Sequence, residues 1–448
     1  MTKQRRIRPA DNFASEAELR FGRPELLREV NARQLLRLLR LHGPCSRADL
    51  VRHSGLSAPT VSSAVVYLHG KGLVEMVGPG RSNGGRPPSL LRFNSTLGYV
   101  AGTDIGRSVV RVALADLSGT LIEKWIAETD PRNTPERVAA LVMKGVRELR
   151  ERHAIPKERV LALGASVPGI TDPHRGIVVS IPNFSSRWDS APLRKLLEAP
   201  SGFTAAVEND VNLAALGENW CGTARGVKDF VFLSIGTGVG AGIFVNGHLY
   251  HGSEWTAGEI AYLYVPGTEE TPLALRRRGP LESVIGSKGI ERFWRSLRNP
   301  ADTPRARSKL EAVEILDLAQ TGTAAARVVL NQTARILADA ITNVCVILNS
   351  SLVVLGGRIG THPALFEATR HIVERNEFSR PRLAVSSLGR EAQLYGAIWL
   401  ALSIADAKVL PRSADRGDHL APAETRFSLP VLGFIPPAST SQHAVTDG

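Results

Sequence analysis

The chain has few cysteines, few aromatic residues and no long apolar run. Its three cysteines, Cys45, Cys221 and Cys345, lie too far apart for a disulfide framework or for metal-ligand spacing, which fits a reducing compartment. No run of apolar residues approaches a membrane span, and the basic N-terminus lacks the apolar core of a signal peptide. We therefore expect a cytoplasmic protein with no membrane partner.

The length and composition allow more than one folded domain. With 448 residues, 43% of them apolar, the chain can bury substantial cores and should divide into two or three domains. Residues 1–24 are polar and basic, and residues 411–448 are rich in Pro, Ser, Asp and Thr, so we expect mobile tails at both ends. Between them, the pattern of expected secondary structure changes near residue 98 to alternating strands and helices. We therefore predict two folded parts, residues 25–93 and residues 98–410.

Residues 46–74 have the pattern of a helix-turn-helix. Ser46 is a good N-cap with Asp49 three residues later, so a short helix should begin there. Gly55 supplies the turn, and Ser57 can cap a second helix. We expect that helix to be the recognition helix of a DNA-binding domain.

The second helix carries one apolar stripe that must be buried. The stripe consists of Val61, Ala64, Val65 and Leu68. An earlier amphipathic segment, residues 31–42, would cover both helices and complete a three-helix core. Short or polar side chains elsewhere on the two helices can reach base edges and phosphates in a major groove. The predicted DNA contacts here are Arg47, Ser57, Pro59, Thr60, Ser63 and Tyr67.

A wing is expected after the helices. Residues 74–93 form two short apolar stretches around a glycine-rich basic tip, in which Arg81 and Arg86 are placed to reach phosphates or a minor groove. Residues 1–92 hold 16 Lys and Arg against seven Asp and Glu, a net charge of +9, whereas the other 356 residues have a net charge of +3. Concentrated cations favour double-stranded DNA as the partner. The alternative is a helical adaptor with a solvated basic face.

From residue 98 the chain reads as a duplicated α/β domain. A strand over 99–106 enters a glycine turn and is followed by two further strands, and the same order returns about 130 residues later at 231–250. The predicted elements between the copies are a helix over 134–153 and a buried strand over 160–166. We expect a cleft between the two copies. Its glycine turns either hold phosphate through close backbone approach or merely reverse the strands.

Several ordered motifs resemble one known family. They are Gly-Gly-Arg-Pro-Pro at 84–88, Asp104-Ile105-Gly106, Val167-Pro168-Gly169, 181–184, Glu208-Asn209-Asp210, 236–242, 257–260, Leu281-Glu282 and Gly356-Gly357. Through them the chain, from about residue 30 to 405, resembles the ROK proteins, which comprise repressors, unassigned reading frames and sugar kinases. The resemblance implies an actin-like, hexokinase-like (ribonuclease H-like) fold with two lobes, which follows the winged helix-turn-helix in the chain.

The resemblance also implies site residues. The implied sugar contacts are Asn183, Asn209, Asp210, Glu259, Tyr262 and Glu282. The implied, vestigial nucleotide contacts are Asp104, Gly106, Gly236, Thr237, Gly238, Gly356 and Gly357. In the family kinases, the residue matching Asp210 accepts the proton of the sugar hydroxyl that attacks ATP. On the residues alone, Asp210 or Asn209 could equally cap the helix that follows.

Two departures from the family pattern argue against a kinase. Arg107 stands where the family kinases have a second glycine in the first hairpin. Tyr262 replaces a zinc-binding histidine, and Leu273, Leu275 and Pro280 replace the three zinc-binding cysteines. We therefore predict no zinc and no other metal or cofactor, with ATP required only if the chain is a kinase. Tyr262 could contact a sugar or lie in the core.

The sequence therefore predicts a DNA-binding transcriptional regulator of carbohydrate metabolism genes, of the repressor kind, and not an enzyme. Its operator affinity would respond to a sugar or sugar phosphate, and a homodimer or dimer of dimers would match a palindromic site. The apolar helix around 323–350 could serve the dimer interface or the core. The main alternative is an active, glucokinase-like sugar kinase. A third is a regulator that has lost its ligand response.

Overall fold

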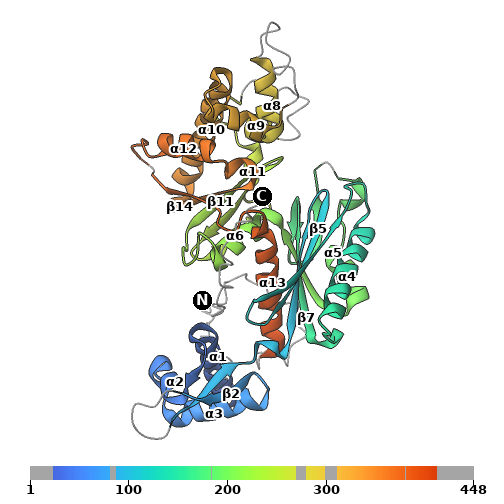
Figure 1. The fold of residues 1–448 in the computed structure, drawn as a ribbon, viewed down its shortest axis with the longest axis vertical. Coiled ribbons are helices and arrows are strands. Elements are labelled where there is room, and N and C mark those ends of the chain that lie inside the picture. Colours follow the sequence, from blue (N-terminus) through green and yellow to red (C-terminus); the bar gives the residue numbers. More distant parts are fainter. Residues whose placement is uncertain are drawn as a thin grey trace, which may run out of the picture. The chain divides into compact units, whose positions relative to one another are not determined.

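The computed structural model describes residues 24–80, 87–182, 184–268, 279–297, 310–378 and 380–410. They form two compact units: the first comprises residues 24–94 together with 409–410, and the second runs from Ser95 to Lys408 (Figure 1). Residues 1–23 and 411–448, expected to be tails, lie outside the described residues. Pro24, assigned to the N-terminal tail on composition, instead begins the first helix.

The first unit combines three helices with a small antiparallel sheet in the order β1-β3-β2. Its elements are α1 (Pro24–His42), β1 (Cys45–Ser46), α2 (Arg47–Ser54), α3 (Ala58–Gly70), β2 (Val74–Pro79) and β3 (Ser89–Phe93). The predicted helix pair and the two wing strands are thus confirmed. The first helix is longer than expected, since it begins at Pro24 and not at residue 31. The wing tip, residues 81–86, lies outside the described residues.

Local hydrogen bonds explain where the helix-turn-helix begins and turns. The Ser46 hydroxyl accepts from the backbone N–H of Asp49 at 3.1 Å, and the Asp49 carboxylate accepts from the backbone N–H of Ser46 at 2.9 Å. This reciprocal pair is a capping box. Gly55 follows α2 with a φ of 69°, which an L side chain rarely adopts. The caps expected at Ser46 and Ser57 are both present.

Replacing Ser46 with alanine should destabilise the first unit by about 1 kcal/mol, because the N–H of Asp49 loses its partner and the Asp49 carboxylate loses the Ser46 hydroxyl. Chemical denaturation of the full chain, followed by circular dichroism, measures this loss. Ser62→Ala is the matched control, since Ser62 is exposed on α3. Equal stability of the two variants would contradict the importance of the box.

The core of the first unit is the predicted one. The α3 side chains Val61, Ala64, Val65 and Leu68 are all buried. They share the interior with Leu35, Leu36 and Leu39 of α1. Helix α3 therefore presents only its remaining faces to solvent.

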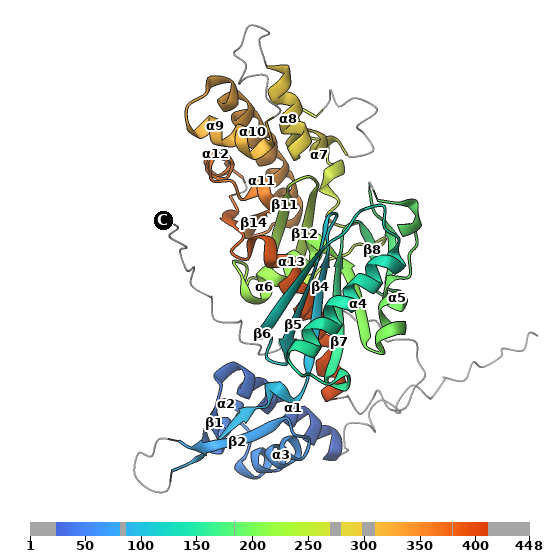
Figure 2. The same ribbon diagram turned by 45° about the vertical axis from the view of Figure 1, so that its right-hand side comes forward.

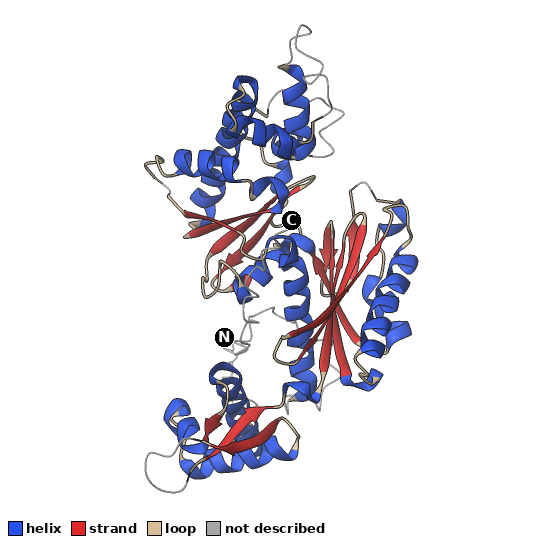
Figure 3. Ribbon diagram, in the orientation of Figure 1, coloured by secondary structure: helices blue, strands red, loops and turns tan. Residues whose placement is uncertain are grey.

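The second unit has two lobes, each built on a five-stranded mixed sheet. In the first lobe the sheet contains β4 (Tyr99–Ile105), β5 (Val109–Asp116), β6 (Leu121–Glu128), β7 (Val160–Val167) and β10 (Thr204–Asn209). Its other elements are α4 (Pro135–Arg152), the hairpin of β8 (Ile170–Asp172) and β9 (Ile177–Ser180), and α5 (Leu193–Ser201). Helices α4 and α5 cover one face of this sheet (Figure 3).

The second lobe follows in the chain. Its sheet contains β11 (Phe230–Ile235), β12 (Val239–Val245), β13 (His248–Leu249), β14 (Leu352–Gly356) and β15 (Arg382–Val385). Its helices are α6 (Asp210–Cys221), α7 (Pro280–Ile285), α8 (Ser287–Ser296), α9 (Ala312–Gln320), α10 (Ala324–Leu348), α11 (Gly357–Gly360) and α12 (Pro363–Val373). The last helix of the unit, α13 (Ala392–Val409), returns to the first lobe.

The two sheets share one topology. Their strand orders are β6-β5-β4-β7-β10 and β13-β12-β11-β14-β15. In each sheet the first three strands in sequence are antiparallel, and the other two run parallel to the first. The duplication predicted from the sequence is therefore confirmed, together with the α/β fold class.

Glycines bring α13 against the first sheet and against α6. A Cβ on Gly164 of β7 would lie 2.0 Å from the carbonyl oxygen of Ala397, and one on Gly396 of α13 would lie 1.9 Å from that of Leu213 in α6. Helix α13 thus lies between the sheet and α6 (Figures 1 and 2). Because no side chain could fit at these contacts, they hold α6, whose first residue is Asp210, close to the sheet.

Helix α10 serves the core of the second lobe. Ten of its side chains are buried, including Ile336, Leu337 and Ile341, which supports the core alternative. Val328, Val346 and Ile347 are 49–79% exposed, so an additional role in a dimer interface stays a prediction. Neither α10 nor any other helix in the described ranges has the length and apolar character to cross a membrane.

Candidate functional site

Two carboxylates from other elements lie near Asp210, which is at the start of α6. They are Asp104 of β4 and Glu259 in the loop after β13. Asp104 is buried and accepts hydrogen bonds from Arg111 Nη1 at 2.7 Å and from Ser166 Oγ at 3.2 Å. Burial raises the pKa of Asp104, although Arg111 and Ser166 oppose the rise.

Asp210 titrates near neutral pH. Burial, reinforced by the negative charges of Asp104 and Glu259, raises its pKa to about 7, against the lowering effect of the hydrogen bond from the backbone N–H of Val211. Burial also raises the pKa of Glu259. A carboxyl group that titrates near neutral pH can both donate to and accept from a hydroxyl group. The cluster is therefore suited to a ligand rich in hydroxyls.

Asn209 provides the helix cap. Its Oδ1 accepts from the backbone N–H groups of Val211 and Asn212 at 2.9 and 3.0 Å, and its Nδ2 donates to the carbonyl oxygen of Gly169 at 2.9 Å. The capping interpretation thus applies to Asn209, whereas Asp210 is the first residue of the helix. These bonds fix the turn that presents Asp210. A direct sugar contact by Asn209 stays a prediction.

A contact between Glu208 and His251 supports this turn. The Oε2 atom of Glu208 lies 2.8 Å from Nε2 of His251, and its Oε1 accepts from Asn212 Nδ2 at 3.0 Å. Burial lowers the pKa of His251, but the charge and hydrogen bond of Glu208 raise it by more. The net effect is a pKa above the ordinary value for histidine. His251 was missed by the sequence analysis. Nothing local points to it, because its partner lies 43 residues away in the chain.

Two further residues expected at the sugar site, Glu282 and Tyr262, lie within the described residues. A carboxylate oxygen of Glu282 accepts from the backbone N–H of Val239 at 3.2 Å, which places Glu282 beside the glycine turn of the second lobe. Tyr262 is 50% exposed, so the core alternative for this residue is wrong. Asn183, the remaining predicted sugar contact, lies outside the described residues.

The residues in the family's zinc positions do not fit zinc. Tyr262 and the buried Pro280 offer neither imidazole nor thiolate, and Leu273 and Leu275, outside the described residues, are hydrocarbons. In the ranges that the structure describes, no three His, Cys, Asp or Glu side chains are grouped so that they could hold a metal ion.

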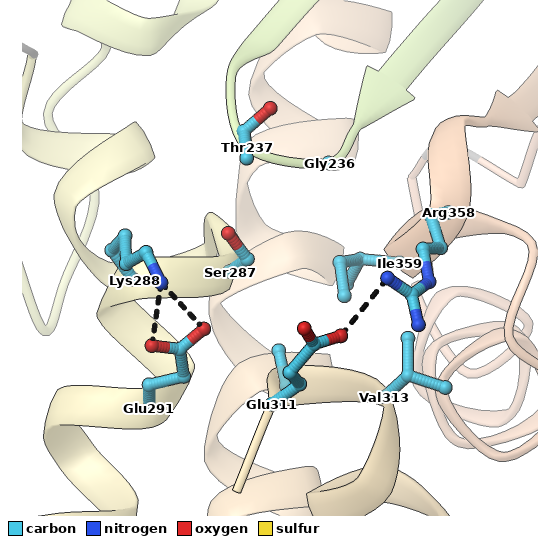
Figure 4. A pocket seen from close by; sticks show the side chains of 10 residues that line it. Gly236, Thr237, Ser287, Lys288, Glu291, Glu311, Val313, Arg358 and Ile359 are labelled. Carbon is cyan, nitrogen blue, oxygen red and sulfur yellow. Dashed lines mark hydrogen bonds and ion pairs between the residues drawn. The ribbon is translucent and has the colours of Figure 1, made fainter. Parts of the chain in front are cut away.

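A cavity of about 310 Å³ adjoins the glycine turn of the second lobe (Figure 4). Its lining includes Gly236 and Thr237, two of the predicted nucleotide contacts. Two ion pairs border it: Lys288 with Glu291 at 2.9 Å, and Arg358 with Glu311 at 3.0 Å. The remaining lining residues are Ser287, Ala312, Val313 and Ile359. No sequence motif indicated the charged residues, which lie in α8, at the N-cap of α9 and in α11.

Packing alone explains most of the other predicted nucleotide contacts. A Cβ on Gly356 would lie 2.2 Å from the ring of Phe232, and Gly357 has a φ of 75°. In the first hairpin, the N–H of Gly106 donates to the carbonyl oxygen of Val109 at 2.9 Å, and Arg107 is exposed. In the second, the N–H of Gly236 donates to the carbonyl oxygen of Gly238 at 2.9 Å. These turns reverse strands whether or not they also hold phosphate.

The predicted DNA-contact face of the first unit is polar and carries cations. Of the residues expected to contact DNA, Arg47, Ser57, Pro59 and Ser63 are exposed, and Thr60 and Tyr67 are partly exposed. The Tyr67 ring has the guanidinium of Arg28 and the ammonium of Lys71 at 5.2 and 5.3 Å from its centre. No sequence motif indicated either cation. Arg81 and Arg86 lie outside the described residues.

Known proteins resemble most of the chain. A xylose repressor of Caldicellulosiruptor bescii is 26% identical over 392 residues, which cover 85% of this chain and 98% of the repressor. A glucokinase of Halalkalibacterium halodurans is 28% identical over 315 residues, covering 67% of this chain and 94% of the kinase. A solved structure of a ROK family transcriptional regulator, a homolog of the E. coli MLC protein, superposes with a TM-score of 0.71. It is 22% identical and covers 86% of this chain and 98% of its own length.

The family assignment rests on the second unit. Residues 100–404 match the ROK family, and they include both lobes, all three site carboxylates and Glu282. The matched region is well over half of the chain, and the superposed regulator shows the same fold. The chain belongs to the ROK family.

Proposed function

We propose that this protein is a transcriptional regulator, of the repressor kind, that binds operator DNA through its first unit and responds to a sugar or sugar phosphate bound at Asp210. The observation that carries the proposal is the presence in one chain of a winged helix-turn-helix and a cluster of carboxylates suited to hydroxyl groups. Similarity to a xylose repressor over 85% of the chain supports it. Such a protein would act in the cytoplasm as a homodimer or dimer of dimers on a palindromic site.

The ligand response needs a difference between two states. A sugar can change operator affinity only if it binds more tightly to one placement of the DNA-binding units than to another. Asp210 and Glu259 would bind sugar hydroxyls, and α6, held by α13, would transmit the occupancy of the site to the rest of the second unit. Gel retardation of the DNA upstream of the gene, with and without a panel of sugars and sugar phosphates, tests both the DNA binding and its response to the ligand. Retardation that no sugar alters would reject the ligand response.

Substitutions in the first unit should separate phosphate binding from sequence recognition. Arg86→Ala should weaken binding to all duplexes and lower the salt dependence, because a phosphate contact releases a counterion. Thr60→Ala should instead reduce discrimination between operator and mutated operator, by up to about tenfold per altered base pair. Competition retardation assays at several salt concentrations measure both effects. If both variants retard DNA as the wild type does, the proposed docking of α3 and the wing is wrong.

A sugar kinase is the second candidate, and two observations favour it. The pKa of Asp210, about 7, suits a general base at neutral pH, and the cavity beside Gly236 and Thr237 offers space near the second glycine turn. Similarity to a glucokinase supports it too. Arg107 in the first hairpin opposes it. A coupled ATPase assay with common hexoses decides: turnover that Asp210→Asn abolishes would establish a kinase.

A further inference from the structure

Trp255 differs from the other tryptophans of the chain. The side chains of Trp125, Trp188, Trp220, Trp294 and Trp399 are at most 8% exposed, whereas Trp255 is partly exposed. It lies in the loop between β13 and Glu259, one of the three site carboxylates. A large aromatic side chain is thus partly exposed in the same short loop as Glu259.

The backbone of Trp255 is strained. Its φ is 61°, in the left-handed region, and Gly252 and Gly258 on either side have φ values of 73° and 90°. A bulky residue is disfavoured in this region, whereas glycine occupies it without steric cost. Strain of this kind is retained where the surroundings hold the residue in place, and it is concentrated at ligand sites. The contacts of the ring indicate what holds Trp255.

Two imidazole rings contact the indole of Trp255. The ring of His174, from the β8–β9 turn, lies 4.8 Å from it between centres at 42°, and the ring of His251 lies 5.6 Å away at 70°. His251 in turn contacts Glu208 at 2.8 Å, two residues before Asp210. The aromatic cluster is therefore linked to the turn that carries Asp210 through His251 and Glu208.

We propose that Trp255 and His174 form an aromatic subsite beside the sugar site, and that the effector is a glycoside of at least two rings. The inference rests on the proposed sugar response and defines its ligand class. Aromatic faces pack against the apolar C–H face of a sugar ring, and imidazole edges bind its hydroxyls. The carboxylates at Asp210 and Glu259 serve one ring, and Trp255, beyond His251, receives the next.

Calorimetry with matched ligands tests the subsite in the full-length protein. The probes are glucose, xylose and N-acetylglucosamine, each compared with its β-1,4-linked disaccharide, and maltose as an α-linked comparison. At least one disaccharide should bind about three- to tenfold more tightly than its own monosaccharide, as expected for one added aromatic contact. Trp255→Ala should abolish this preference, and Trp255→Phe should retain part of it. Phe378→Ala is the control, since Phe378 is 84% exposed in the second lobe and should leave the preference intact.

Two further measurements guard against a folding artefact. Trp255→Gly relieves the left-handed strain, so it should fold at least as well as Trp255→Ala and lose the preference equally. Binding of the preferred disaccharide should alter the tryptophan emission of the wild type, and Trp255→Phe should remove that change. If monosaccharides bind as tightly as all the disaccharides, or if the Trp255 variants keep the preference, the subsite is wrong while the sugar response stands. If neither these sugars nor their phosphates bind the wild type, the subsite and the sugar response both fall.

Discussion

Asp210→Asn should make the protein more stable at pH 8. The folded chain holds the pKa of Asp210 at about 7, whereas an aspartate in an unfolded chain titrates near 3.9. Between these values the folded state binds the proton more tightly, so the stability of the wild type falls as the pH rises from about 4 to 7 and is then level. Asparagine carries no charge. The gain should be near zero at pH 4 and reach roughly 2–4 kcal/mol at pH 8.

Urea denaturation measures this gain. The wild type and the variant are compared at pH 5 and pH 8, and the unfolding transition of the second unit is followed. Asp189→Asn is the control, because Asp189 is exposed outside the carboxylate cluster. Asp210→Asn should at the same time weaken sugar binding by about 10- to 100-fold, the value of a hydrogen bond to a charged group. A gain in stability with a loss of binding is typical of a residue retained for function. A variant less stable than the wild type at pH 8 would contradict the assigned environment.

Glu218→Ala should cost about 3–5 kcal/mol of folding free energy, the largest loss among the substitutions considered. Glu218 lies in α6 and is fully buried. Its carboxylate accepts from the backbone N–H groups of Thr223 at 2.7 Å and Leu388 at 3.1 Å, and from the hydroxyl group of Ser386. Alanine would leave these partly buried donors without an acceptor, and each would keep part of its desolvation cost. The bonds also join α6 to the segment that leads into α13.

Thermal unfolding and urea titration of the full chain test the role of Glu218. Glu218→Gln should lose less than Glu218→Ala, because the amide oxygen still accepts although the charge is gone. Glu314→Ala, in the exposed first turn of α9, would lose only a local capping bond. If Glu218→Ala unfolds within 1 kcal/mol of the wild type, as is usual for surface substitutions, the buried network does not anchor α6.

Local signals in the sequence were sufficient for much of the fold. The capping residues Ser46, Ser57 and Thr134 begin helices where the sequence placed them, because a cap is a contact within three or four residues. The turn at Asn246-Gly247 has both residues at positive φ, as such a pair predicts. The two glycine turns, 130 residues apart, were enough to reveal the duplicated topology.

Only those residues of the carboxylate site that belong to short sequence motifs could be predicted from the sequence. Asp104, Asp210 and Glu259 were named by resemblance, but their closeness, and the resulting pKa of Asp210, depends on packing between distant elements. The same holds for the pair of Glu208 with His251 and for the ion pairs at the cavity. Trp255 gave no signal, since its left-handed backbone is usual for glycine and not for tryptophan.

Fluorescence anisotropy of the full-length protein on a labelled duplex from upstream of its gene tests the central claim most directly. We expect binding tighter than to an unrelated duplex, weakening steadily with salt, and a shift of about fivefold or more in Kd when one sugar or glycoside is added. Equal affinity for both duplexes, unaltered by any sugar, in a preparation that phosphorylates glucose with ATP would show that the chain is a kinase and not a regulator.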